Sequence, residues 1–155
     1  PVETLNVIYN SCDVGVNTCK GEGHGLVNHE HAACGVPQIV PNHTSCKEIF
    51  EGAGLMIDNL FTDVDMNYNR DMPVPSTSSL VEHLNTLYQK PEIYERVATA
   101  CYERATDSKY QWDTIAQQFA VEFEQVLTPP EKLEVPVLKR PKRRSSKEKV
   151  PVATT

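Results

Sequence analysis

DVGVNTCKGEGHGLVNHEHAACGVPQIVP, residues 13–41, is the stretch that decides the fold of this chain. Residues 13–18 place valines at alternate positions, as a strand does, and a loop with three alternate glycines follows. Residues 25–34 have the composition of a helix, Gly35 can take the positive φ of a helix C-cap, and Pro37 prevents continuation. The apolar end of the stretch is typical of a buried parallel strand. The order predicted is therefore strand, glycine loop, helix, strand.

Two carboxylates flank the start of the predicted helix. Glu22 lies in the loop and Glu30 lies inside the helix, with seven residues between them. The free N–H groups at the helix start form a site for an anion, and the loop glycines let a phosphate approach the backbone closely. Since a helix rises ~1.5 Å per residue, the carboxylates lie at either end of a span of ~10 Å. A nucleotide sugar has this layout, with sugar hydroxyls, diphosphate and ribose hydroxyls in order. The candidate donor-binding residues are Gly23, His24, Gly25, Leu26 and Glu30.

Each of these features alone has an ordinary structural explanation. A Gly-x-Gly-x-Gly loop before a helix is common. A glutamate such as Glu30 is most often a solvated helix residue, and His24 can simply pack in its loop. The ordered combination of strand, loop, two carboxylates, Gly-x-Pro and second strand is far more specific than any single part.

On these residues, the stretch resembles the nucleotide-sugar-binding half of a retaining GT-B glycosyltransferase, glycosyltransferase family 4. The Glu-x7-Glu motif of that family falls on Glu22 and Glu30, and a further family glutamate falls on Glu48. The resemblance is close over residues 5–57 and general from there to about residue 127. The other residues that carry it are Asp13-Val14, Gly23-His24-Gly25-Leu26 and Ala33-Cys34-Gly35-Val36-Pro37.

This chain departs from the family pattern at several positions. His24 replaces the usual aromatic residue, and His43-Thr44 stand where the family usually has glycines. Asn28 and His29 are more polar than the family norm, and His31 replaces a small apolar residue.

The resemblance implies a fold and a reaction. The fold is α/β, a Rossmann-like parallel sheet that forms the C-terminal half of a GT-B fold, with a helical C-terminus. The reaction is transfer of a hexose from a nucleoside-diphosphate sugar to an unknown acceptor, with retention. Glu22 would be catalytic, accepting from donor-sugar hydroxyls, and Glu30 would accept from the ribose hydroxyls. The backbone at 24–26 would hold the diphosphate, so neither a metal nor a cofactor is expected.

An alternative is a non-catalytic donor-binding remnant, or an interaction protein. Compared with the family pattern, the acceptor-binding domain and the first strands of the donor-binding domain are missing from these 155 residues. We therefore expect a fragment of a longer enzyme, which is inactive in isolation if catalysis needs donor and acceptor positioned together.

Charge divides the chain into two expected parts. Residues 1–127 form the predicted nucleotide-sugar-binding domain, incomplete at its N-terminus. Residues 128–155 lack periodicity and are predicted to form a disordered basic tail. From residue 129 onward the tail holds eight of the fifteen Lys and Arg but three of the twenty-one Asp and Glu, so it carries +5 and the rest carries −11. The tail could contact an anionic surface or an import receptor, or be a solvated charge run.

Cysteine and histidine spacing argue against metal and disulfides. The five cysteines are odd in number and contain no C-x-x-C pair, which favours reduced thiols in a cytosol over a disulfide framework or a zinc site. They are expected to be small core residues. His29 and His31 are two residues apart on a predicted helix, so their side chains point to different faces and are poorly placed to bind the same ion. No apolar run reaches the ~20 residues of a membrane span and no leader opens the chain, so we expect a cytoplasmic protein.

The remaining segments continue the alternation of helix and strand. Helical patterns are predicted at 3–10 and 46–51 and a strand at 55–57, whereas 58–75 is predicted to be a long loop with one strand near 65–68. Three helices are expected after it, the first capped by Ser76 or Ser79. The third carries an apolar stripe with Trp112 in the core or as an anchor between helices. The other stripe residues are Ile115, Phe119, Phe123 and Val126.

Overall fold

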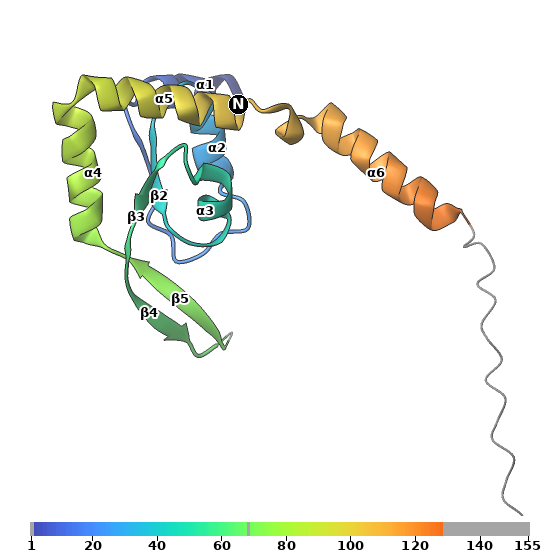
Figure 1. Ribbon diagram of the computed structural model, residues 1–155, viewed down its shortest axis with the longest axis horizontal. Helices are drawn as coiled ribbons and strands as arrows, with labels where there is room; N and C mark the ends of the chain where they lie inside the picture. The colour runs from blue at the N-terminus through green and yellow to red at the C-terminus, as the bar shows by residue number, and fades with distance from the viewer. Residues whose placement is uncertain (1, 68, 129–155) are drawn as a thin grey trace, which may run out of the picture.

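A small parallel sheet forms the centre of the molecule (Figure 1). The computed structural model describes residues 2–67 and 69–128. Strand order is β1-β2-β3, with both neighbours parallel to β2, and Ile39 lies opposite both Val16 and Leu55. The strands are β1 Gly15–Val16, β2 Gln38–Pro41 and β3 Leu55–Ile57. The predicted α/β class with a parallel sheet is confirmed, although the first strand is shorter than the 13–18 pattern suggested.

Helices connect and cover the strands as the sequence pattern predicted. They are α1 Val2–Asn10, α2 Leu26–Ala32, α3 Thr44–Phe50, α4 Thr77–Gln89, α5 Pro91–Ala105 and α6 Trp112–Leu127, with a 3-10 turn η1 at Ser108–Tyr110. Helix α2 ends at Ala32 with Ala33 as its C-cap, two residues earlier than the 25–34 pattern predicted, whereas Gly35, the expected C-cap, does have a left-handed φ of 81°. The Ser76 side chain caps α4 by accepting from the Ser79 N–H, and α5 begins with a proline at its first position.

The core lies between the sheet and helices α2, α3, α4 and α5, of which α5 crosses one end of the sheet in Figure 1. All four residues of β2 are buried, and all of them except Gln38, the first, are apolar. Ile39, Phe50 and Ile57 are fully buried, each of which contributes about 1.5–3 kcal/mol through removal from water. The remaining buried members of the cluster are Ala32, Val40, Cys46, Ile49, Leu87, Val97, Cys101 and Ala105.

The segment 58–75 is a β-hairpin, so the prediction of a long loop was wrong. Strands β4 Asn59–Asp65 and β5 Arg70–Pro75 pair antiparallel and project from the body in Figure 1. Its sequence looks polar because six of the seven residues of β4 are exposed. Its two prolines are tolerated because a two-stranded ribbon consists of edge strands, where a missing N–H need not break a ladder.

Helix α6 does not enter the core, so the prediction that Trp112 is a core or interhelix residue was wrong. The helix extends away from the body in Figure 1, and none of its residues is buried. Trp112 is 82% exposed. The apolar periodicity correctly predicted an amphipathic helix. Periodicity cannot show, however, whether another part of the protein covers the apolar face.

The predicted basic tail, residues 128–155, lies from residue 129 on outside the described residues. Among the helices that the structure does describe, none is long and apolar enough to cross a membrane.

Candidate functional site

The loop between β1 and α2 lies at the carboxyl end of the parallel sheet, the edge where open α/β sheets bind ligands. Glu22 turns its carboxylate back toward the start of α2. Gly25 is buried there with φ 78°, and a Cβ on it would lie 2.9 Å from Glu22 Oε2. The loop therefore needs glycine at 25 both for the left-handed backbone and for the space that the Glu22 carboxylate fills.

A chain of amides beneath the loop fixes Glu22. Asn17 Nδ2 donates to Glu22 Oε2 at 2.7 Å and to Asn28 Oδ1 at 2.8 Å. Asn28 Nδ2 donates in turn to Gln38 Oε1 at 2.8 Å, and Gln38 Nε2 donates to the Val36 carbonyl at 2.9 Å. Because Asn28 and Gln38 are buried, each of these hydrogen bonds is costly to break. The network connects the loop carboxylate to the central strand.

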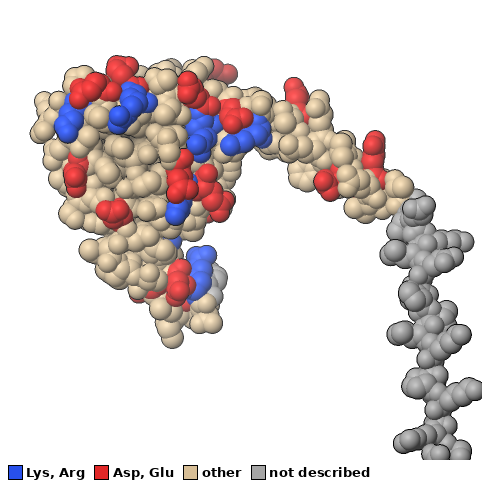
Figure 2. All heavy atoms as spheres, in the orientation of Figure 1, with Lys and Arg blue, Asp and Glu red and all other residues tan. Residues whose placement is uncertain are grey.

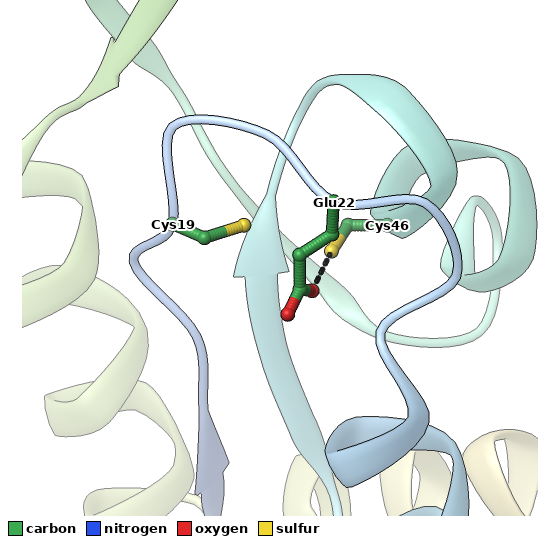
Figure 3. Close-up of side chains that lie close together, drawn as sticks. All are labelled: Cys19, Glu22 and Cys46. Atoms are coloured by element: carbon green, nitrogen blue, oxygen red, sulfur yellow. Dashed lines mark hydrogen bonds between the residues drawn. The ribbon is translucent and has the colours of Figure 1, made fainter.

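Two thiols complete the surroundings of Glu22 (Figure 3). Cys46 Sγ, from α3, lies 3.5 Å from Glu22 Oε2, and the Cys19 side chain points into the same space. Burial, then the neighbouring Cys19 and Glu22, raises the pKa of Cys46 to about 12. Burial also raises the pKa of Cys19. Both thiols are therefore protonated at neutral pH, which argues against a thiolate nucleophile.

All five cysteines, which lie among the described residues, are free. Cys46 and Cys101 are fully buried, as expected of small core residues. Cys12 is exposed, so that expectation was wrong for it, and Cys19 and Cys34 are half-buried.

A groove of about 440 Å³ runs beside the loop and is lined by residues of the loop, α3, η1 and α6. Gly23, His24 and Lys109 all line it, and the Lys109 ammonium pairs with Asp107 at 3.5 Å. The Ser45 hydroxyl donates to the Glu22 carbonyl at 3.0 Å and so ties α3 to the loop. The remaining lining residues are Ser45, Glu48, Ile49, Tyr110 and Gln118.

Aromatic rings join the loop to η1. The His24 ring lies 5.2 Å from that of His29, and His29 meets Tyr110 edge-on at 4.7 Å. His29 Nε2 hydrogen-bonds the Ala105 carbonyl at 3.1 Å, which makes this nitrogen the protonated one in a neutral ring. Burial and the neighbouring His24 lower the pKa of His29. His29 is therefore neutral at pH 7, and its ring packs between His24 and Tyr110.

Glu30 lies elsewhere. It is exposed and accepts from the Tyr9 hydroxyl at 3.0 Å, and it lines a hollow of about 580 Å³ between α1 and α2. The structure thus brings Glu22 together with Gly25, places Gly23 and His24 on the groove, and gives Glu30 a different neighbourhood. Leu26 begins α2 and is 64% exposed.

Sequence reasoning missed the residues that hold Glu22. Asn17 and Gln38 were not singled out, and Asn28 was noted as unusually polar without a role. A usable signal existed in Gln38, since an amide inside an apolar strand requires buried partners. Cys46 offered no such signal, because it meets the loop through the packing of α3.

Residues 1–128 carry a net charge of −11. Figure 2 shows both acidic and basic side chains on the body, and α6 carries acidic residues and no Lys or Arg. Two of the nearby lysines pair with carboxylates, Lys20 with Asp63 at 3.1 Å and Lys47 with Glu51 at 3.8 Å. A diphosphate bound here would face few cations from the described residues.

Comparisons with known proteins agree with this architecture. A family model described as glycosyl transferase-like matches residues 1–120. A sucrose-phosphate synthase from Thermosynechococcus elongatus is similar over 80% of this chain and 28% of its own, at 24% identity and a TM-score of 0.61. HepE from Anabaena, solved in complex with UDP and glucose, is similar over 76% of this chain and 29% of its own, at 20% identity and a TM-score of 0.59. No curated protein sequence matches this chain. The fold is that of GT-B glycosyltransferases, and the chain spans less than a third of either structure.

Proposed function

We propose, for a chain that belongs to the glycosyl transferase-like family, that this domain binds a nucleoside-diphosphate sugar and supports retaining transfer of its hexose. The observation that carries the proposal is the fixed Glu22 carboxylate at the carboxyl edge of the sheet. An amide and a thiol hold one of its oxygens, at 2.7 and 3.5 Å. Neither partner is cationic, so the carboxylate keeps its full charge for a hydroxyl or for positive charge at an anomeric centre.

The parts of the donor would meet different residues. Sugar hydroxyls would donate to Glu22, and the backbone at 24–26 would hold the diphosphate, with His24 beside it. Lys109 would supply positive charge in the groove, which it lines with Gly23 and His24. That the HepE structure contains UDP and glucose supports this class of donor. The scheme requires no metal or cofactor from the domain.

Glu30 would bind the ribose. Its carboxylate already accepts from a hydroxyl, that of Tyr9, at 3.0 Å. Two vicinal ribose hydroxyls could replace that single donor, because an ionised carboxylate has about four acceptor sites. The hollow between α1 and α2, which Glu30 lines, would then hold the nucleoside end of the donor.

Isothermal titration with UDP, GDP and ADP, and then with their glucose conjugates, tests the proposal. We expect the chain to bind one nucleoside diphosphate, and Glu22→Gln to keep that binding while losing the extra affinity of the sugar. Glu51→Gln is the matched control, because Glu51 is an exposed glutamate paired with Lys47. Failure of every nucleotide and conjugate to bind would overturn the donor assignment.

The alternative is a donor-binding protein that does not catalyse, or an interaction protein. The exposed apolar stripe of α6 favours an interaction, since a 16-residue helix with no buried residue keeps this stripe open. A sugar-nucleotide hydrolysis assay separates the two. Turnover that is lost in Glu22→Gln identifies an enzyme, whereas binding without turnover identifies a non-catalytic domain.

A further inference from the structure

Three ligand-type side chains converge beside the donor loop. Cys19 and Glu22 both come from the loop between β1 and α2, and Cys46 comes from α3. The two Sγ atoms and a Glu22 carboxylate oxygen all lie within 4.8 Å of one another. Figure 3 shows the thiols on either side of the carboxylate, with all three side chains directed into one space.

We propose that Cys19, Glu22 and Cys46 form a binding site for Zn²⁺, in which the bound ion prevents the Glu22 carboxylate from binding the donor. The sequence argued against zinc because it contains no closely spaced cysteine pair. Cys19 and Cys46 are distant in sequence and meet through the fold.

The distances fit a tetrahedral ion after small side-chain shifts. With bond lengths of ~2.3 Å to sulfur and ~2.1 Å to oxygen, the ligand atoms of a tetrahedral site lie ~3.6 to ~3.8 Å apart. Cys46 Sγ and Glu22 Oε2 are 3.5 Å apart already. The 4.8 Å bound on the other pairs therefore requires approaches of ~1 Å at most.

The ligand chemistry selects the metal. Two thiolates and a carboxylate suit zinc, whereas magnesium and calcium require oxygen ligands. Three protein ligands leave the fourth position of zinc open, so water or substrate could reach the ion. Each thiol that binds the ion gives its proton to the buffer, so two protons leave as two Zn–S bonds form.

A neighbouring amide supports the ligands. Asn17 Nδ2 donates to Glu22 Oε2 at 2.7 Å and lies 3.8 Å from Cys46 Sγ. Groups that hydrogen-bond metal ligands fix their orientation, and their loss weakens metal affinity by about 10–100-fold. The nearest basic residue in the loop, Lys20, is engaged with Asp63 on the hairpin at 3.1 Å.

Occupation of this site has a functional consequence that rests on the proposed function. A carboxylate bound to zinc cannot at the same time accept from a donor-sugar hydroxyl. Zinc binding and sugar binding would therefore exclude one another at Glu22, and zinc would inhibit the domain.

Titration of the full, metal-free chain with Co²⁺ tests the site without any donor. We expect thiolate-to-cobalt charge-transfer absorption that saturates at one equivalent and disappears when Zn²⁺ is added. Cys19→Ser and Cys46→Ser should each weaken Co²⁺ binding at least 10-fold. Cys34→Ser is the control, because Cys34 lies in the hollow between α1 and α2 and should leave the titration unchanged.

Circular dichroism of each variant verifies folding, and Cys46→Ala replaces Cys46→Ser if the buried hydroxyl unfolds the chain. No charge-transfer band in the unmutated chain, or an equal loss in Cys34→Ser and Cys19→Ser, would overturn the site.

Titration of nucleotide sugar with and without Zn²⁺ tests the competition separately. We expect donor affinity to fall at least 10-fold in zinc. Unchanged donor affinity alongside a normal cobalt titration would overturn the competition. A chain that binds no donor overturns the proposed function, and the cobalt titration still decides the metal site.

Discussion

Substituting Gly15 with alanine should disrupt the amide network that holds Glu22, because Gly15 of β1 lies beside Gln38 of β2. A Cβ on Gly15 would lie 2.0 Å from Gln38 Oε1 and 2.5 Å from its Cδ and Nε2. The Gln38 side chain is fully buried and hydrogen-bonds both Asn28 and the Val36 carbonyl. The backbone fixes the position of a Cβ, so an alanine side chain cannot rotate away from this clash. The amide of Gln38 or the strand itself must therefore move.

The cost follows from what the move breaks. Overpacking a core costs about 1–3 kcal/mol, and each buried group left without its hydrogen bond costs about 1–3 kcal/mol. One overpacked contact and two lost hydrogen bonds together cost at least ~3 kcal/mol, and restricting the unfolded chain offsets ~0.4–1 kcal/mol of this. The free energy of unfolding should therefore fall by ~2 kcal/mol or more. At an m-value of ~2 kcal/mol/M, this moves the urea midpoint down by ~1 M or more.

Urea unfolding followed by far-UV circular dichroism measures the effect, because the exposed Trp112 is a poor fluorescence probe of the core. Gly21→Ala is the matched control, since a Cβ there meets nothing within 4 Å, and it should change stability by less than ~1 kcal/mol. Gly15→Ala with Gln38→Ala should cost less than the sum of the two single changes, since the clash is gone. Equal midpoints for Gly15→Ala and Gly21→Ala, or strict additivity, would refute the reasoning.

Four further outcomes are expected. Glu30→Ala should weaken nucleoside-diphosphate binding about 10–100-fold, from ~1.5–3 kcal/mol per hydrogen bond to a charged group, and leave pyrophosphate binding unchanged in the same titration. Deleting 129–155, predicted from composition alone to be a tail, should shift the thermal midpoint by less than ~4 °C. Thr44 has a φ of 48°, which costs a β-branched residue ~1–2 kcal/mol, so Thr44→Gly should leave the free energy of unfolding in urea unchanged or raise it. Thr77→Gly, at the start of α4, is the control and should lower it. Burial lowers the pKa of His43, so the unfolded state binds more protons than the folded state in mildly acidic solution. The free energy of unfolding should therefore fall as the pH drops below ~6.5, and it should fall less steeply in His43→Gln.

Local signals predicted the central architecture because they act over short distances. The glycine at 35, the proline at 37 and the apolar run after them predicted that a helix ends and a strand begins here. Gly35 is left-handed and β2 begins at Gln38, although α2 ends two residues earlier than expected. The hairpin formed by β4 and β5 was missed because neither strand shows the alternation of a strand with one buried face: β4 is exposed almost throughout, and β5 is exposed and then half-buried. Trp112 was misplaced because amphipathic periodicity cannot specify a partner.

The candidate site divides in the same way. Glycine spacing and the two carboxylates predicted that the loop and α2 bind the ligand, and this stays a prediction. Sequence could not show that Glu22 lies against Gly25 and the thiols while Glu30 reaches Tyr9, because those contacts depend on how α1 and α3 pack. One departure of the sequence from the family pattern was informative. Asn28, which is more polar than the family norm, forms part of the buried hydrogen-bond network.

The way Glu22 is held explains how one carboxylate could serve two ligands. A carboxylate paired with Lys or Arg would have its charge largely neutralised and would bind a cation weakly. The hydrogen bonds to Glu22 come instead from Asn17 and Cys46, which orient it without neutralising it. The chain outside the basic tail carries a net charge of −11, which adds to the negative field. Such a carboxylate attracts both a polarised sugar hydroxyl and a divalent ion, and since both need the same lone pairs, it can hold only one of them at a time.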